Sequence, residues 1–114
     1  MKVLVCGSRD WTDADVIANR LADLAPDYPV VLHGGARGAD LLADGICSVF
    51  GYEVQAFPAD WRKHGKRAGI LRNLAMLDEQ PDLVIAFQRN GSRGTQHTID
   101  EARRRGIPVE VHTA

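Results

Sequence analysis

The chain lacks an excess of charge of either sign, and it lacks a long apolar run. Its 114 residues include 14 basic and 15 acidic side chains, so no overall field draws it to nucleic acid or to an anionic membrane. No apolar stretch is long enough to span a bilayer, and the N-terminus leads directly into a strand pattern rather than a signal peptide. We therefore expect a cytoplasmic protein without a membrane partner.

Cysteine is scarce, and several catalytic fingerprints are absent. Cys6 and Cys47 form no C-x-x-C pair, and the four histidines are not spaced for a metal, so buried thiols and no metal site are expected. The first strand-to-helix turn lacks G-x-G-x-x-G, no Walker lysine follows a glycine-rich loop, and no serine lies in a nucleophile elbow. The sequence therefore favours no cofactor, and it disfavours metal-dependent hydrolysis and acyl transfer.

Apolar runs alternate with helical patterns along the whole chain. Strands are expected at residues 3–6, 30–33, 53–57, 83–87 and 109–111. This alternation predicts an α/β fold over residues 1–114, a single Rossmann-like domain with a doubly wound, five-stranded parallel sheet and helices on both faces. With strand order 3-2-1-4-5, the switch point lies between the loops that begin at Gly7 and Gly91.

Two details of the helices are also predicted. Thr12 is expected to cap the first helix, with Asp15 three residues later. The second helix is expected to end at Gly51 and to bury one apolar stripe, which consists of Leu41, Leu42, Ile46, Val49 and Phe50.

Three glycine-rich polar loops, at residues 7–10, 34–40 and 90–95, each follow an apolar run and open a helical segment. Because such loops emerge at the carboxyl ends of parallel strands, they converge on one crevice. A basic crevice on a nearly neutral protein suits a small anion. The basic side chains in or beside these loops and the third connection are Arg9, Arg37, Arg62, Lys63, Lys66, Arg67, Arg72, Arg89 and Arg93.

Each loop has a binding interpretation and a structural one. The segment 91–95 offers backbone N–H groups at a helix N-terminus for a phosphate, or else Gly91 supplies a positive φ and Thr95 caps the helix. The segment 34–40 is interpreted as a second phosphate cradle, in which Asp40 accepts hydrogen bonds from ribose hydroxyls or caps its helix. The segment 7–9 binds an anion through its backbone and guanidinium, or is an ordinary surface loop.

Four side chains outside these loops are also candidates. The face of Trp61 can stack on a base or cover the edge of the sheet. Asp60 is the best-placed free carboxylate. Arg72 and Asn73 interrupt an apolar helical pattern, and the pattern alone favours the solvated side of that helix for both.

A series of short motifs occurs in a fixed order along the chain: Gly7-Ser8-Arg9, Gly34-Gly35-Ala36-Arg37-Gly38-Ala39-Asp40, Phe57-Pro58-Ala59-Asp60-Trp61, Gly69, Arg72-Asn73, and Ala86-Phe87 with Gly91-x-x-Gly94-Thr95. In this order the motifs resemble those of the YspA-like family of the SLOG superfamily. The superfamily includes the LOG phosphoribohydrolases and the DNA-processing protein DprA. The resemblance implies a Rossmann-like fold, a nucleotide-derived ligand and a homo-oligomer.

The resemblance also bears on individual residues. Gly91, Gly94 and Thr95 match the phosphate-binding turn of the LOG enzymes, and Arg72 matches a helix arginine that precedes it, which implies that Arg72 faces the ligand. Where the LOG enzymes carry a catalytic glutamate, this chain has Thr98, and a hydroxyl cannot stabilise an oxocarbenium-like transition state as a carboxylate does.

Three functions follow from these patterns. The first is a sensing or binding domain for a nucleotide or nucleotide-derived phosphorylated ligand. The second is a nucleotide N-glycosidase, with Asp60 and Arg72 as candidate catalytic residues and Asp40 or Asp10 as substitutes for Asp60. The third, which the nearly neutral charge disfavours, is single-stranded nucleic-acid binding through Trp61 and the basic side chains of residues 62–67. The predicted ligand-binding residues are Gly7, Ser8, Arg9, Gly34, Gly35, Ala36, Gly38, Asp40, Trp61, Asn73, Gly91, Ser92, Gly94 and Thr95.

Overall fold

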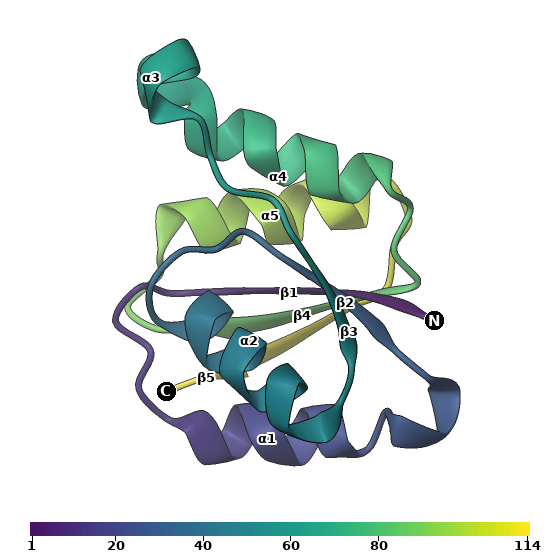
Figure 1. Cartoon of the computed structure of the whole chain (residues 1–114). Helices are drawn as coiled ribbons and strands as arrows, with labels where there is room; N and C mark the ends of the chain where they lie inside the picture. The colour runs from purple at the N-terminus through teal and green to yellow at the C-terminus, as the bar shows by residue number, and fades with distance from the viewer.

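A computed structural model describes residues 1–114 and shows an α/β fold built on a five-stranded parallel sheet (Figure 1). The strands are β1 (Lys2–Gly7), β2 (Val30–His33), β3 (Glu53–Ala56), β4 (Leu83–Gln88) and β5 (Val109–Thr113). Their order in the sheet is β3-β2-β1-β4-β5, and every neighbouring pair is parallel. The predicted fold class and strand order are confirmed.

Helices cover both faces of the sheet, as Figure 1 shows. Helices α1 (Ala14–Ala22) and α2 (Ala39–Phe50) lie on one face, whereas α4 (Ala68–Asp78) and α5 (Arg93–Arg104) lie on the other. A short helix α3 (Trp61–His64) and the 3₁₀ turn η2 (Gly65–Arg67) precede α4, and α3 extends beyond the end of α4. Another 3₁₀ turn, η1 (Ala25–Asp27), precedes β2. None of the helices combines the length and the apolar character that crossing a bilayer requires.

The central strands are buried on both faces, which explains their continuous apolar runs. On β1, Val3 and Val5 pack with the α1 and α2 layer, whereas Leu4 and Cys6 pack with the α4 and α5 layer. All four side chains are buried. Because a strand covered on both faces has no solvated side, it shows no alternation of polar and apolar residues. The same reasoning applies to β4, where Val84 to Phe87 are all buried.

The N-terminus of α1 differs from the prediction. Asp13, not Thr12, is the N-cap, and its Oδ1 accepts a hydrogen bond from the Val16 N–H at 3.3 Å. Both residue types are good N-caps, so the sequence alone does not decide between neighbours.

The buried face of α2 also differs from the predicted stripe. It consists of Ala39, Ala43 and Cys47, while Leu41 and Val49 are 52% and 83% exposed. The helix crosses the end of β1 closely, and a Cβ added at Gly7 would collide with the Cβ of Ala39. A close approach requires small side chains at the centre of the contact face. Of the predicted stripe, Leu42 and Ile46 are partly buried and pack against this core, whereas Leu41, Val49 and Phe50 are exposed.

A candidate ligand-binding cavity

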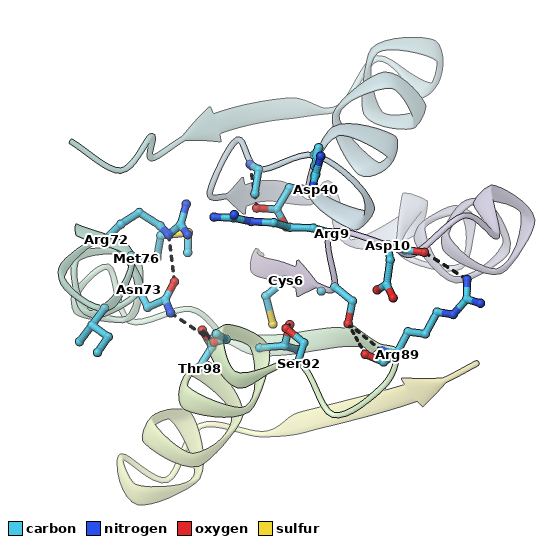
Figure 2. Close-up of a pocket in the computed structure, with 18 of the residues that line it drawn as sticks. Cys6, Arg9, Asp10, Asp40, Arg72, Asn73, Met76, Arg89, Ser92 and Thr98 are labelled. Carbon is cyan, nitrogen blue, oxygen red and sulfur yellow. Dashed lines mark hydrogen bonds between the residues drawn. The ribbon is translucent and has the colours of Figure 1, made fainter. Parts of the chain in front are cut away.

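A cavity of about 650 Å³ lies at the carboxyl ends of the central strands, beside the switch point (Figure 2). Figure 2 shows Arg72 and Asn73 on one side of it, Asp10 and Arg89 on the other, and Cys6 between them. A smaller cavity of about 340 Å³ shares Arg9, Ala36, Arg37, Trp61 and Arg72 with the first. The sequence-predicted residues that line the larger cavity are Gly7, Ser8, Arg9, Ala36, Asp40, Trp61, Arg72, Asn73, Ser92, Gly94 and Thr95.

Positive charge predominates in the lining of the larger cavity. It contains five basic side chains and two acidic ones, Asp10 and Asp40, although the whole chain has a formal net charge of −1. None of the basic side chains in the lining forms an ion pair within the protein. A bound anion would therefore meet uncompensated cations. The five basic residues are Arg9, Arg37, Lys66, Arg72 and Arg89.

The pKa of Arg72 is affected by its burial and by the charges around it. Desolvation of the partly buried guanidinium lowers the pKa of Arg72; the carboxylate of Asp40 opposes this effect, and the nearby charge of Arg9 adds to it. An anion placed beside both arginines would relieve the repulsion between them.

Arg72 and Asn73 both face the interior of the site, so the solvated side that the helical pattern favours is wrong. Arg72 Nη1 donates to the carbonyl oxygen of Gly34 at 2.6 Å, and its Nε donates to Asn73 Oδ1 at 2.9 Å. Asn73 is buried, and its Nδ2 donates to the carbonyl oxygen of Gly94 at 3.4 Å. Periodicity counts apolar residues, and it does not register polar side chains whose burial is compensated by hydrogen bonds.

The backbone amides of the loop after β2 are already bonded within the protein. The N–H groups of Gly34 and Ala36 both donate to Asp40 Oδ2, at 3.0 and 3.3 Å. The N–H of Gly35 donates to Nδ1 of the buried His33 at 2.9 Å. The amides of Gly34, Gly35 and Ala36 are therefore not free for a phosphate, whereas the N–H groups of Arg37, Gly38 and Asp40 have no acceptor within the protein, so the predicted cradle is restricted to residues 37–40.

Packing and backbone conformation account for the glycines of the same loop. A Cβ at Gly34 would collide with the guanidinium of Arg72, and one at Gly38 would collide with the carbonyl oxygens of Ser8 and Arg9. Gly38 also has a φ of +81° and Gly35 a φ of +70°, which side chains rarely adopt. Gly34 and Gly35 line only the smaller cavity, and Gly38 lines neither.

Asp40 is the acidic group at the base of the cavity. Burial raises the pKa of its carboxyl, while hydrogen bonds from Ala36 and Gly34 and the charges of His33 and Arg72 oppose that rise. Both backbone donors use Oδ2, so Oδ1 has no partner within the protein and stays available to a ligand. Its neighbour Cys6 is a neutral thiol, because burial raises the pKa of that group well above its ordinary value.

The N-terminus of α5 also presents free amides to the cavity. Ser92 is its N-cap but makes no side-chain capping bond, and the N–H groups of Arg93, Gly94 and Thr95 have no acceptor in the protein. A Cβ at Gly94 would meet no atom within 4 Å, so the space in front of this turn is open. By contrast, α1 and α3 are capped by aspartates, whereas α2 shares with α5 the lack of a side-chain cap. The open helix end is suited to an anion.

Three of the remaining predicted residues have structural roles or lie outside the cavity. Asp60 caps α3 by accepting from the Lys63 N–H at 3.1 Å, and it lines neither cavity. The Ser8 hydroxyl donates to the carbonyl oxygen of Arg89 at 3.0 Å and accepts from its N–H at 2.7 Å, so it is fully used within the protein. Gly91, with a φ of +61°, shapes the turn without lining either cavity.

The cavity also includes residues that the predicted ligand-binding set omits. Arg37, Lys66 and Arg89 belong to the predicted basic crevice, and their position after strand ends or before a helix is the signal in the sequence that could place them in the site. Asp10 accepts from Asn90 Nδ2 at 3.0 Å across the switch point. Asp10 and Asn90 both line the cavity, and the other omitted residues are Cys6, Gly69, Ile70, Met76 and Thr98.

Comparisons with known proteins place this α/β chain in a family. The model of the YspA, cpYpsA-related SLOG family matches residues 1–64, more than half of the chain. Gene 61 protein of Mycobacterium phage D29 is 42% identical over 116 residues, covering 95% of this chain and 93% of that protein. The chain belongs to the YspA, cpYpsA-related SLOG family, as the sequence motifs predicted.

A solved structure has the same fold. The X-ray structure of TM1055, a structural genomics target, superposes with a TM-score of 0.74 at 21% sequence identity, covering 95% of this chain and 71% of that one.

Proposed function

We propose that the larger cavity binds a nucleotide or a nucleotide-derived phosphorylated ligand, and that the protein is a binding or sensing domain. The observation that carries this proposal is the uncapped N-terminus of α5, which opens on a cavity lined by five basic side chains and only two acidic ones. Free N–H groups and the positive end of a helix dipole favour a phosphate at this position.

The other lining residues fit the remaining parts of a nucleotide. Trp61 is 51% exposed and offers a face for a base, with the Arg9 guanidinium carbon 5.9 Å from its ring centroid. Asp40 Oδ1, which accepts no bond from the protein, is a suitable acceptor for a ribose hydroxyl. Arg72 lies between these groups and the phosphate position, since Asn73 links it to Gly94.

Binding without cleavage is supported by the position that the LOG enzymes use for a glutamate. Thr98 Oγ1 donates to the carbonyl oxygen of Gly94 at 3.3 Å, and the side chain is buried. A hydroxyl in this position supplies no carboxylate for cleavage.

A nucleotide N-glycosidase remains the second candidate function. Asp40 favours it, because a buried carboxyl with a raised pKa and one unbonded oxygen suits proton transfer. In that case Asp40→Asn abolishes release of free base, whereas Asp60→Asn has no effect.

A ligand screen with a matched pair of glycine variants tests the proposal. Nucleoside mono-, di- and cyclic phosphates, NAD, ADP-ribose and ribose 5-phosphate are assayed by calorimetry and by mass spectrometry, which separates binding from turnover. Gly94→Val places a β-branched side chain in front of the free amides, and Gly45→Val makes the same change on α2, where a Cβ also meets open space. We expect only Gly94→Val to abolish binding, with both variants folded. Equal affinity in the two variants would refute a phosphate at α5.

A further inference from the structure

Residues 61–67, named here the basic projection, concentrate positive charge at one corner of the molecule. The segment comprises α3 and η2, and all seven of its residues are exposed. It contains four of the 14 lysines and arginines of the chain and none of its 15 acids. In Figure 1, α3 lies at the far end of α4, away from the sheet. The four cations are Arg62, Lys63, Lys66 and Arg67, and none forms an ion pair within the protein.

The basic projection is continuous with the cavity. Trp61 and Lys66 line the cavity, whereas Arg62, Lys63 and Arg67 lie outside both cavities. Trp61 lies over Gly69 of α4, where an added Cβ would be 3.4 Å from the indole ring. The basic projection therefore borders the proposed nucleotide site at Trp61 and Lys66 and carries three further cations outside it.

The segregation of charge changes the argument drawn from the nearly neutral composition. Electrostatic fields in physiological salt decay over about 8 Å, so a flexible anion responds to the charges nearest to it rather than to the sum over the chain. Within the basic projection the side-chain charges of lysine and arginine are all positive, and Asp60, the cap of α3, is the acid directly before it in the chain.

We propose that the cavity holds the terminal nucleotide of a phosphorylated single strand, and that the following phosphates lie along the basic projection. This inference rests on the proposed function, because the terminal phosphate occupies the N-terminus of α5. Single-stranded rather than double-stranded nucleic acid fits, because a cavity of about 650 Å³ admits one extruded nucleotide and Trp61 needs an unpaired base to stack on.

A length series tests the inference. Oligothymidylates of one to six nucleotides, with a 5′-phosphate, a 3′-phosphate or neither, are titrated against the protein between 50 and 300 mM salt. We expect affinity to rise about tenfold or more from one to four nucleotides at low salt. Each additional phosphate contact steepens the salt dependence, and three contacts correspond to a change of about −2 in the slope of log affinity against log salt.

Charge-removing double variants separate the basic projection from the cavity. Arg62→Gln/Lys63→Gln is expected to remove most of the gain with length and to leave binding of thymidine monophosphate unchanged. Arg103→Gln/Arg104→Gln is the matched control, because it removes the same charge at the opposite end of α5 from the cavity. The control is expected to change neither the gain with length nor the slope.

The possible outcomes are distinguishable. If mononucleotides bind and length adds nothing, the inference is wrong and the proposed function stands. If long strands bind without a terminal phosphate, bind unchanged to Gly94→Val, or bind no better than the corresponding duplex, the strand does not enter the cavity and the inference is wrong. If phosphorylated strands do not bind, the inference is wrong; if no compound of the ligand screen binds either, the proposed function fails together with it.

Discussion

The guanidinium of Arg72 donates a 2.6 Å hydrogen bond to the carbonyl oxygen of Gly34, joining α4 to the loop after β2. Its Nε bonds Asn73, which reaches the carbonyl oxygen of Gly94 in the first turn of α5. The loop after β2 and the start of α5, which are distant in the sequence, are thus connected through one pair of adjacent residues on α4. This connection gives specific consequences for substitutions in the cavity.

Gly34→Ala is expected to displace Arg72 and weaken ligand binding. The added Cβ would collide with the guanidinium, and Arg72 would lose its hydrogen bond to the loop. We expect about a tenfold loss of affinity, or about 1.4 kcal/mol, in calorimetric titration with the ligand found by the screen. Gly45→Ala is the control, because its Cβ meets open space and lies outside the cavity. A Gly34→Ala protein that binds as tightly as the control would show that Arg72 does not need this position.

Asn73→Ala is expected to lower both stability and affinity. The substitution leaves Arg72 Nε without its acceptor inside a partly buried site and removes the donor to Gly94. Losing a buried hydrogen-bonding partner costs about 1–3 kcal/mol, which chemical denaturation measures as a lower free energy of unfolding. Asn19→Ala, on the exposed side of α1, removes an amide that makes no hydrogen bond within the protein, so a change below about 0.5 kcal/mol is expected there. Equal destabilisation by the two variants would contradict the role assigned to Asn73.

Asp40→Asn is expected to change how stability depends on pH. The raised pKa of Asp40 means that the folded protein holds a proton that the unfolded chain releases as pH rises above about 3.8. The native protein therefore loses stability across that interval, and the variant does not. The amide oxygen of asparagine still accepts from Gly34 and Ala36. We expect the stability difference, variant minus native, to increase as pH rises from 3.8 and then level off; a constant difference would argue against the raised pKa.

Glu110→Gln is expected to show the opposite sign. Hydrogen bonds from Arg20, at 2.6 and 2.8 Å, hold the pKa of Glu110 below its ordinary value of 4.5 and join α1 to β5. The stabilisation is present above about pH 4.5 and is lost as pH falls through the lowered pKa. Because the pair is partly exposed, we expect a loss of about 1 kcal/mol or less at pH 7, disappearing at low pH. Urea denaturation at several pH values measures it, and a loss that persists at low pH would show that packing is responsible.

The sequence was sufficient for the sheet and for its order. The central strands β1, β2 and β4 contain apolar runs, the edge strands β3 and β5 alternate apolar and polar residues, and short right-handed connections leave few arrangements of such strands. The convergence of the loops at one edge follows from the same rule. Local patterns were less informative for α2, because the size of the contact-face residues is fixed by how closely the helix approaches β1, a tertiary property.

The roles of the glycine-rich loops could not be separated from the sequence. Residues 34–36 and 91–95 look alike as glycine-rich helix starts, yet the amides of the first are taken by Asp40 and His33, while those of the second are free. The sequence contains Asp40 and His33, but it does not show that their side chains accept hydrogen bonds from the amides of residues 34–36. The inward orientation of Arg72 follows from the family resemblance and not from the helical pattern, because the hydrogen bonds that compensate its partial burial are not visible in the sequence.

The two hydrogen bonds between the Ser8 hydroxyl and the backbone of Arg89 join the loops on either side of the switch point. These loops form one wall of the cavity, and they are thereby fastened to each other at their base. The opposite wall carries Trp61 and Lys66 on a short helical segment at the margin of the molecule. One wall of the cavity is thus fixed by hydrogen bonds between its two loops. We therefore expect adjustment to ligands of different size at the wall that bears Trp61.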